Sequence, residues 1–254
     1  MNIAADRNKA DDLPKAIRIA GVCKTFGQRA VLNNLSFNMD AAEAVFLCGI
    51  NGAGKSTLLR IVSGILSPDS GSVKIYGHDI HRNPDTAKSQ LGIISHKSMV
   101  YPDLTVSENL LFFAALYGVP DRLRRVDELL EDVALSAYRY DRAAILSRGL
   151  LQRLSIARAM VHKPSILLAD EPFTGLDTQA CQYLVAVFDR FTNNGGTIIM
   201  TSHDLGLALR NCGRVMVLDK GRIIFDQAKA ALDIAGFSQD YLSYARNNEC
   251  GISG

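Results

Sequence analysis

The most constraining feature of the sequence is the segment Gly49–Ser56, which reads Gly-Ile-Asn-Gly-Ala-Gly-Lys-Ser. It fits the pattern G-x-x-x-x-G-K-[ST] in full, and it lies between the apolar run Val45–Cys48 and a predicted helix, Lys55–Gly64. Glycines allow backbone amides to turn inward around phosphate groups, and the helix N-terminus adds positive potential. The segment therefore predicts a phosphate-binding loop within an α/β fold.

Several residues of this loop have predicted roles. Lys55 can reach the β- and γ-phosphates of a nucleotide, and the Ser56 hydroxyl can hold a magnesium ion. The residues of the loop that we expect to contact the nucleotide are Gly49, Asn51, Gly52, Ala53, Gly54, Lys55, Ser56 and Thr57. The alternative is an ordinary glycine-rich turn, which the complete pattern between a strand and a helix disfavours.

Two acidic residues end a second apolar run. Ile166–Ala169 reads as a buried strand, and Asp170 and Glu171 follow it directly. Ligands of open α/β sheets bind at the carboxyl ends of the strands, so we expect Asp170 to hold magnesium and Glu171 to orient the attacking water as general base. The alternative is that both acids only begin a loop before Pro172.

The rest of the chain alternates between strand-like and helical segments, which favours a parallel sheet with helices on both faces. Leu, Ala, Glu and Arg at helical spacing dominate the middle of the chain, which predicts an inserted helical subdomain at about residues 97–162. We expect a flexible tail at residues 1–15, one domain at residues 16–226 and a C-terminal extension at residues 227–254.

Composition excludes several classes of protein. The chain has 254 residues with 28 basic and 26 acidic side chains, and no Lys/Arg run suggests a nucleic-acid partner. Five scattered cysteines without a CxxC pair argue against a disulfide framework or a zinc site. The longest apolar run, Leu110–Val119, is shorter than the about 20 residues of a membrane span, and the polar start does not fit a signal peptide. Any action at a membrane is therefore expected to need a partner.

A third motif points to one family. The segment Leu146–Arg153 reads LSRGLLQR and resembles the LSGGQ signature of ATP-binding cassette (ABC) ATPases. Ser147 and Gly149 match the signature, whereas Arg148 replaces a glycine and Leu150 replaces the usual glutamine. Ser147 also fits the N-cap of the following helix, and such a cap offers free amides to a phosphate. In this family the signature contacts the γ-phosphate of ATP held by the other subunit.

Three further segments resemble motifs of the same family. Thr174–Asp177 is similar to the D-loop, where the alternative for Asp177 is a plain helix cap. Thr201–Asp204 is similar to the switch-histidine loop, in which His203 is expected to contact the γ-phosphate. Phe26 occupies the place of the aromatic residue that stacks on adenine, and a packed core phenylalanine is its alternative.

One position departs from the family pattern. The loop after the predicted strand Leu91–Ser95 normally has a glutamine, and this chain has His96. Glutamine offers a carbonyl to magnesium and an amide to water, whereas a neutral imidazole can do only one of these at a time. The resemblance places His96 at the metal, and the substitution leaves that role open.

The resemblance covers roughly residues 17–225 and implies both a fold and a function. The implied fold is α/β, with a P-loop NTPase core around a mainly parallel sheet, an N-terminal antiparallel β subdomain and an inserted helical subdomain. The implied function is an ATP-hydrolysing transporter subunit on the cytoplasmic side of the cell membrane, which uses ATP and Mg²⁺. The catalytic residues that it implies are Lys55, Glu171 and His203.

The implied partners are a polytopic membrane permease and a second ATP-binding subunit, paired head to tail. We expect the permease to dock near Met99, Tyr101 and Leu104. Within the family, the sequences of these motifs are most similar to those of haem-exporter subunits of cytochrome c maturation. The alternative is a soluble ABC ATPase acting in translation or DNA maintenance, which usually carries tandem cassettes or long insertions that this chain lacks.

Overall fold

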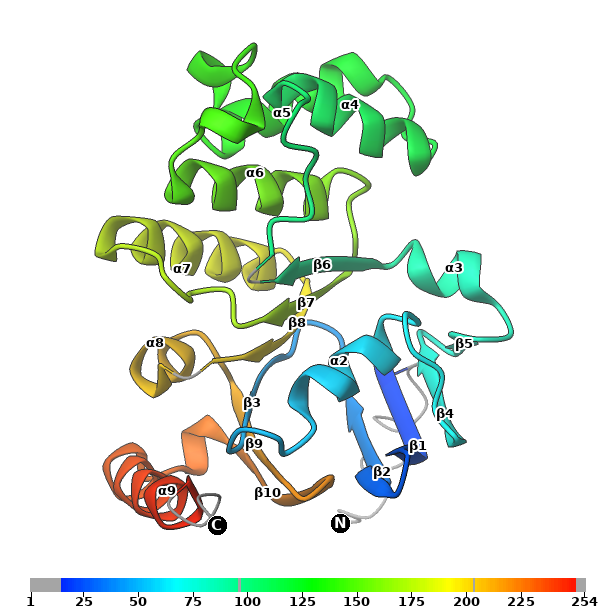
Figure 1. Cartoon of the computed structure of the whole chain (residues 1–254), viewed down its shortest axis with the longest axis vertical. Helices are drawn as coiled ribbons and strands as arrows, with labels where there is room; N and C mark the ends of the chain where they lie inside the picture. Colours follow the sequence, from blue (N-terminus) through cyan, green and yellow to red (C-terminus); the bar gives the residue numbers. More distant parts are fainter. Residues whose placement is uncertain (1–14, 96, 203, 250–254) are drawn as a thin grey trace, which may run out of the picture.

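The structure is a computed structural model that describes residues 15–95, 97–202 and 204–249, and its strands form two sheets (Figure 1). The smaller sheet is antiparallel, in the order β2-β1-β4-β5. Its strands are β1 (Ile17–Phe26), β2 (Arg29–Met39), β4 (Ser70–Ile75) and β5 (His78–Asp79). The larger sheet has the order β10-β9-β3-β8-β7-β6. Its strands are β3 (Ala44–Cys48), β6 (Leu91–Ser95), β7 (Ile166–Asp170), β8 (Thr197–Thr201), β9 (Arg214–Asp219) and β10 (Arg222–Ala228).

The larger sheet is parallel from β9 to β6, and only the hairpin partner β10 runs antiparallel. Alternate residues of its strands face opposite layers. In β3, Val45 and Leu47 pack toward α2 (Lys55–Val62) and the antiparallel sheet, whereas Phe46 and Cys48 pack toward α8 (Leu205–Arg210). The parallel strands thus carry helices on both faces, as expected for fully buried strands.

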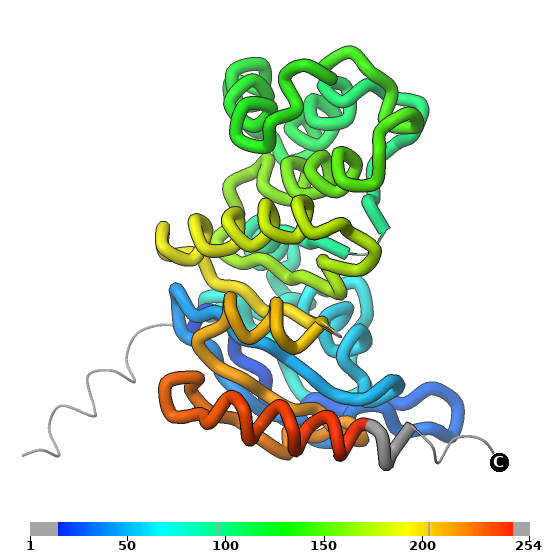
Figure 2. The backbone as a smooth tube through the Cα atoms, turned by 90° about the vertical axis from the view of Figure 1, so that its left-hand side faces the viewer, coloured from blue at the N-terminus to red at the C-terminus, as the bar shows by residue number. Residues whose placement is uncertain are grey.

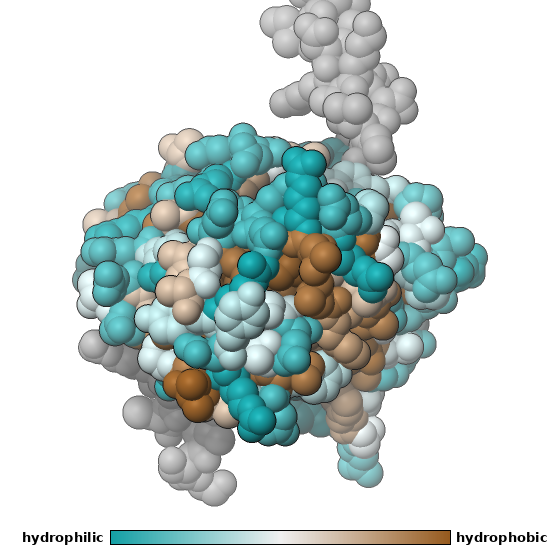
Figure 3. Space-filling model, turned by 90° about the horizontal axis from the view of Figure 1, so that it is seen from above, coloured by the Kyte–Doolittle hydropathy of each residue, from teal (hydrophilic) through white to brown (hydrophobic). Residues whose placement is uncertain are grey.

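Helices of the middle segment form a layer at one end of the molecule. They are α4 (Val106–Leu116), α5 (Arg122–Asp132), η1 (Ser136–Tyr138), η2 (Ala143–Ile145) and α6 (Arg148–Met160). Thr105 begins α4 with a capping box, because its hydroxyl accepts from Glu108 N–H and the Glu108 carboxylate accepts from Thr105 N–H. Viewed from this end, apolar side chains gather in a patch among polar ones (Figure 3).

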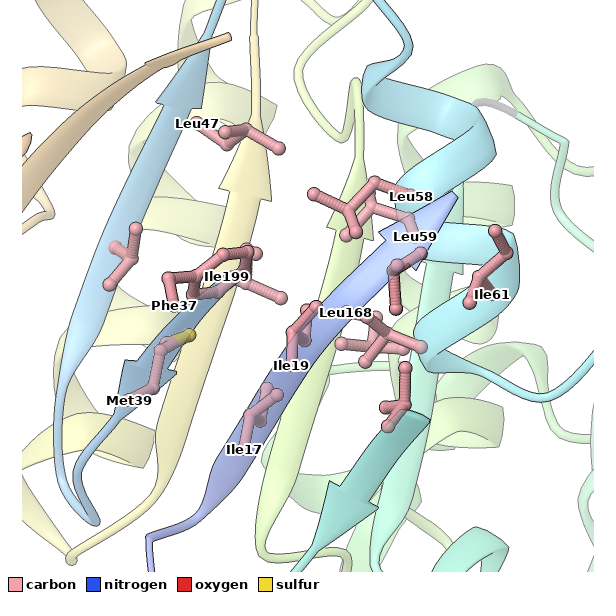
Figure 4. Close-up of a cluster of buried hydrophobic side chains, with 14 of the residues drawn as sticks. Ile17, Ile19, Phe37, Met39, Leu47, Leu58, Leu59, Ile61, Leu168 and Ile199 are labelled. Carbon is pink, nitrogen blue, oxygen red and sulfur yellow. The ribbon is translucent and has the colours of Figure 1, made fainter. Parts of the chain in front are cut away.

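The main hydrophobic core lies between the antiparallel sheet, α2 and the parallel sheet (Figure 4). Ile17 and Ile19 of β1 share this cluster with Leu58 of α2, and Leu168 and Ile199 complete it from the parallel strands. All five side chains are buried. This core ties the helix after the phosphate loop to both sheets, which holds the loop in a fixed place.

The described residues form further helices outside the middle segment. They are α3 (Pro84–Lys88), α7 (Thr178–Asn193) and α9 (Ile234–Glu249), and a short η3 (Lys229–Ala231) precedes the last. The tube view shows α9 along the sheet, at the end opposite α4 and α5 (Figure 2). The expected fold class is confirmed in all three of its parts: the mainly parallel sheet, the antiparallel β layer and the helical insertion.

Candidate nucleotide-binding site

The predicted phosphate loop connects β3 to α2. Gly54, the residue before α2, has a φ of 110°, and a Cβ there would lie 2.9 Å from the Val31 carbonyl oxygen. Only glycine adopts this conformation at no steric cost and fits so close to a neighbouring backbone. Lys55 is buried, and its Nζ donates to the carbonyls of Gly49 at 2.7 Å and Ile50 at 3.2 Å. The lysine ammonium therefore lies within the curve of the loop.

A cavity of 320 Å³ opens beside the loop, a volume within the range of small-molecule sites. It is lined by Phe26, Arg29, Val31, Asn51, Gly52, Gly54, Lys55, Ser56, Thr57 and Glu171. The side chain of Phe26 is 50% exposed, with Lys24 Nζ 5.7 Å from its ring centroid. An exposed ring at the rim of this cavity fits the predicted stacking surface better than a core residue.

The carboxyl end of β7 brings Asp170 to the start of α2. Ser56 Oγ donates to Asp170 Oδ1 at 3.2 Å, and Thr201 Oγ1 at the end of β8 donates to the same oxygen at 2.8 Å. A hydroxyl and a carboxylate are the oxygen ligands that magnesium uses together with water and phosphate oxygens. Among the described residues no cluster of three His, Cys, Asp or Glu could hold a metal. The pair Ser56 and Asp170 fits a magnesium ion that a bound nucleotide helps to coordinate.

Glu171 adopts a strained backbone conformation directly after β7. Its φ is 53°, in the left-handed region that costs a non-glycine residue free energy. Its N–H donates to Thr201 Oγ1 at 3.0 Å, and its carboxylate accepts from Thr174 Oγ1 at 3.5 Å. These contacts hold the Glu171 side chain at the wall of the cavity.

The predicted signature and D-loop residues lie outside this lining. Ser147 is exposed and caps α6, because its Oγ accepts from Leu150 N–H at 3.4 Å. Asp177 caps α7 by accepting from Ala180 N–H at 2.7 Å. Arg148, the residue that departs from the family signature, donates to the Thr174 carbonyl at 2.9 Å and so links the two segments. Gly149 is half-buried on the same turn.

The two predicted histidines, His96 and His203, lie outside the described residues. The structure adds three residues to which the sequence motifs gave no role in the site. Thr201 joins Asp170 to Glu171, Arg29 lines the cavity, and Tyr241 of α9 contacts the loop itself. Each lies far from its partner in the chain, so no local spacing could reveal it.

Comparisons with known proteins agree with this geometry. The family model for ABC transporters matches residues 32–174. The Nod factor export ATP-binding protein I of Paraburkholderia xenovorans (strain LB400) is 38% identical over 219 residues, covering 85% of this chain and 72% of that protein. The linearmycin resistance ATP-binding protein LnrL of Bacillus subtilis (strain 168) is 32% identical over 210 residues, covering 82% and 68%.

Solved structures show the same fold. An ATP-binding subunit of an ABC transporter has a TM-score of 0.78 at 29% identity, covering 84% of this chain and 90% of that one. The dimeric ATP-binding cassette MJ0796 bound to ADP and Pi has a TM-score of 0.76 at 24% identity, covering 85% and 100%.

The chain belongs to the ABC transporter family and is an ATP-binding subunit of an ABC transporter. It is an ATP hydrolase of the ABC type. The two relatives named above are associated with Nod factor export and linearmycin resistance. They lend no support to the haem-export expectation, and they do not favour a soluble ABC ATPase without a membrane partner. No helix in the described ranges is long and apolar enough to cross a membrane.

Proposed function

We propose that this chain binds ATP and Mg²⁺ in the cavity beside residues 49–57 and hydrolyses ATP to power export through a membrane-embedded partner. The observation that carries the proposal is the meeting of three elements at one place. The loop lysine Lys55, the carboxylate Asp170 beside the first turn of α2 and the strained Glu171 all lie at the carboxyl ends of β3 and β7. Open α/β sheets bind their ligands there.

In the proposed reaction, Lys55 and the loop amides bind the β- and γ-phosphates, and Phe26 stacks on the adenine. Ser56 and Asp170 hold Mg²⁺, which neutralises phosphate charge when bound. Glu171 accepts a proton from the attacking water as this water adds to the γ-phosphorus, and the bond to the ADP oxygen breaks. The Thr201 hydroxyl holds the Asp170 carboxylate and the Glu171 backbone N–H, and so fixes the two acidic residues relative to each other.

We propose that one chain does not complete the site alone. Ser147, Gly149 and Asp177 lie outside the cavity lining, and the cap at Ser147 offers the N-terminal end of α6 to an incoming phosphate. A second ATP-binding subunit, paired head to tail, would bring its own Ser147 and Gly149 to the γ-phosphate. His203 and His96, which lie outside the described residues, keep their expected roles at the γ-phosphate and at the metal.

The proposed docking surface for the permease lies beside α4. Met99 is 44% exposed and Tyr101 47% exposed, and Leu104 is half-buried next to them. Tyr101 packs edge-on against Phe112, with ring centroids 5.0 Å apart, and stacks on Phe113 at 6.1 Å. An exposed aromatic cluster of this kind suits the apolar face of a short helix from the partner.

A chain of contacts connects this surface to the nucleotide site. Arg158 of α6 lies over the Phe113 ring at 5.5 Å and donates to the Ile93 carbonyl of β6. Two residues further along β6, Ser95 pairs with Asp170. We propose that movement at the docking surface reaches Asp170 along this route, at the cytoplasmic side of the cell membrane.

Export is the direction that we adopt, because the relative from Paraburkholderia xenovorans is named for Nod factor export. Haem export rests only on the resemblance of the motif sequences to haem-exporter subunits, and neither relative named above is named for haem export. We therefore propose export, and the transported substrate is to be identified by experiment.

A retention assay on membranes from the native host tests the docking surface. Tyr101→Glu and Met99→Glu are expected to lose retention by washed membranes while keeping the ATPase activity of the isolated chain. Ile224→Glu is the matched control, because Ile224 is 56% exposed on β10, at the other end of the molecule. Full retention of both docking variants would overturn the proposed surface, and no retention of the unmodified chain would overturn the membrane partner.

A further inference from the structure

The phosphate loop forms hydrogen bonds with residues near the C-terminal end of the described chain. Gly49, its first residue, donates its N–H to the Tyr241 hydroxyl oxygen of α9 at 3.0 Å. Near the other end of the loop, the Ala53 carbonyl accepts from Gly221 N–H, in the turn between β9 and β10, at 3.1 Å. Two backbone groups of the loop therefore have partners in a part of the chain for which the sequence suggested no role.

Close packing leaves Gly49 little room on this side. A Cβ at Gly49 would lie 2.3 Å from the Leu218 carbonyl oxygen of β9. Because its N–H is engaged by Tyr241, the Gly49 amide points away from the loop interior. The amides of the following residues are left to converge on the phosphates, so the position of Tyr241 sets where the loop begins to curve.

Tyr241 is itself fixed by a row of rings. Phe237, Tyr241 and Tyr244 follow at helical spacing on one face of α9, which packs on β9 and β10. Phe237 lies 5.3 Å from Phe225 of β10 and 6.0 Å from Tyr241, and Tyr244 lies 6.5 Å beyond Tyr241. Ring contacts over this range restrict the rotation of the Tyr241 side chain, so its hydroxyl is presented to Gly49 in one place.

We propose that Tyr241 is a positioning residue for the phosphate loop, and that α9 thereby sets the affinity of the site for ATP. The inference rests on the proposed function of the loop as the ATP-phosphate site. Losing the hydroxyl frees one backbone amide, and the loop must then be ordered by the nucleotide as it binds. ATP affinity falls, whereas the bond-breaking step at Glu171 keeps its geometry.

The test compares Tyr241→Phe with Tyr244→Phe in the full chain. Tyr241→Phe keeps the ring row and is expected to raise both the ATP Kd and KM roughly three- to tenfold, with kcat within about twofold of the unmodified protein. Tyr244→Phe removes a hydroxyl from the same face of α9, where it lies beside Asp219 whereas the Tyr241 hydroxyl accepts from Gly49, and should leave all three constants unchanged. Hydrogen exchange at the Gly49 amide should quicken only in Tyr241→Phe.

The outcomes of these measurements distinguish a positioning role of Tyr241 from a purely structural one. Unchanged Kd and Gly49 exchange in Tyr241→Phe would overturn the inference, and a lower melting temperature without a shift in Kd would assign Tyr241 a purely structural role. Lys55→Ala separates the inference from the proposed function. If Lys55→Ala binds ATP normally, the assignment of the loop fails. If it loses ATP while Tyr241→Phe does not, only the role of Tyr241 fails.

Discussion

Among the site residues to which the motifs gave no role, Thr201 is expected to be the most sensitive to substitution. It is fully buried at the end of β8, where its hydroxyl donates to Asp170 at 2.8 Å and accepts the Glu171 N–H at 3.0 Å. Thr201→Val keeps the shape of the side chain and removes both hydrogen bonds. A hydrogen bond to a charged group contributes about 1.5–3 kcal/mol, and an unsatisfied buried N–H costs about 1–3 kcal/mol.

These two effects share one hydroxyl and overlap, so we expect the free energy of unfolding to fall by about 2–4 kcal/mol. Small displacements of a catalytic group are costly, and kcat for ATP hydrolysis should fall roughly 10- to 100-fold. The ATP Kd should stay within about threefold, because the loop amides and Lys55 are untouched. Urea unfolding, isothermal titration with ATP and a steady-state phosphate-release assay measure the three quantities.

Thr201→Ser is the matched control, because it keeps the hydroxyl and loses only a methyl group. It should lose about 1 kcal/mol of stability and keep kcat within a few-fold of the unmodified chain. The proposed role of Thr201 is excluded if Thr201→Val retains the kcat of Thr201→Ser, since the hydroxyl would then position neither Asp170 nor Glu171.

Two further predictions follow from perturbed pKa values. Burial lowers the pKa of His162 from 6.5 to about 4, and its ring stacks on Tyr117 with centroids 3.8 Å apart. The unfolded chain binds the proton more tightly, so between pH 7 and pH 4 the unmodified chain should lose roughly 2–3 kcal/mol more stability than His162→Phe; parallel urea-midpoint curves for the two would contradict this. The Ser70 hydroxyl and the Asn34 N–H lower the pKa of the Cys23 thiol, whereas burial raises that of Cys48 to about 12. Peptide mapping after native maleimide labelling should therefore find Cys23 modified and Cys48 protected until the chain unfolds, and early modification of Cys48 would count against the buried thiol.

Local sequence patterns predicted the elements that carry the motifs. The loop at Gly49–Ser56, the strand before Asp170 and the caps at Ser147 and Asp177 all depend on neighbouring residues, and the structure has each of them where the pattern indicates. Spacing within a strand or a helix turn is enough to predict such features. The roles of these residues in catalysis stay predictions.

Contacts between distant segments could not be predicted in the same way. Thr201 meets Asp170 only because β7 and β8 pair in one particular register, and Tyr241 meets Gly49 across most of the chain. The helical run before Tyr117 shows the same limit. It is apolar nearly all round, and packing alone decides that Leu110 and Ala114 are buried while Phe112 is 43% exposed.

We propose that two chains complete the ATP site head to tail, and the oligomeric state of Glu171→Gln is the direct test of this pairing. This variant is expected to keep ATP binding and to lose the proposed general base, so analytical ultracentrifugation should show a shift from monomer to dimer when Mg-ATP is added. Adding Ser147→Glu to the same chain should preserve ATP binding and prevent the dimer, because a carboxylate would face the γ-phosphate of the opposite subunit. A Glu171→Gln protein that stays monomeric at saturating Mg-ATP, or a dimer that tolerates Ser147→Glu, would contradict the claim.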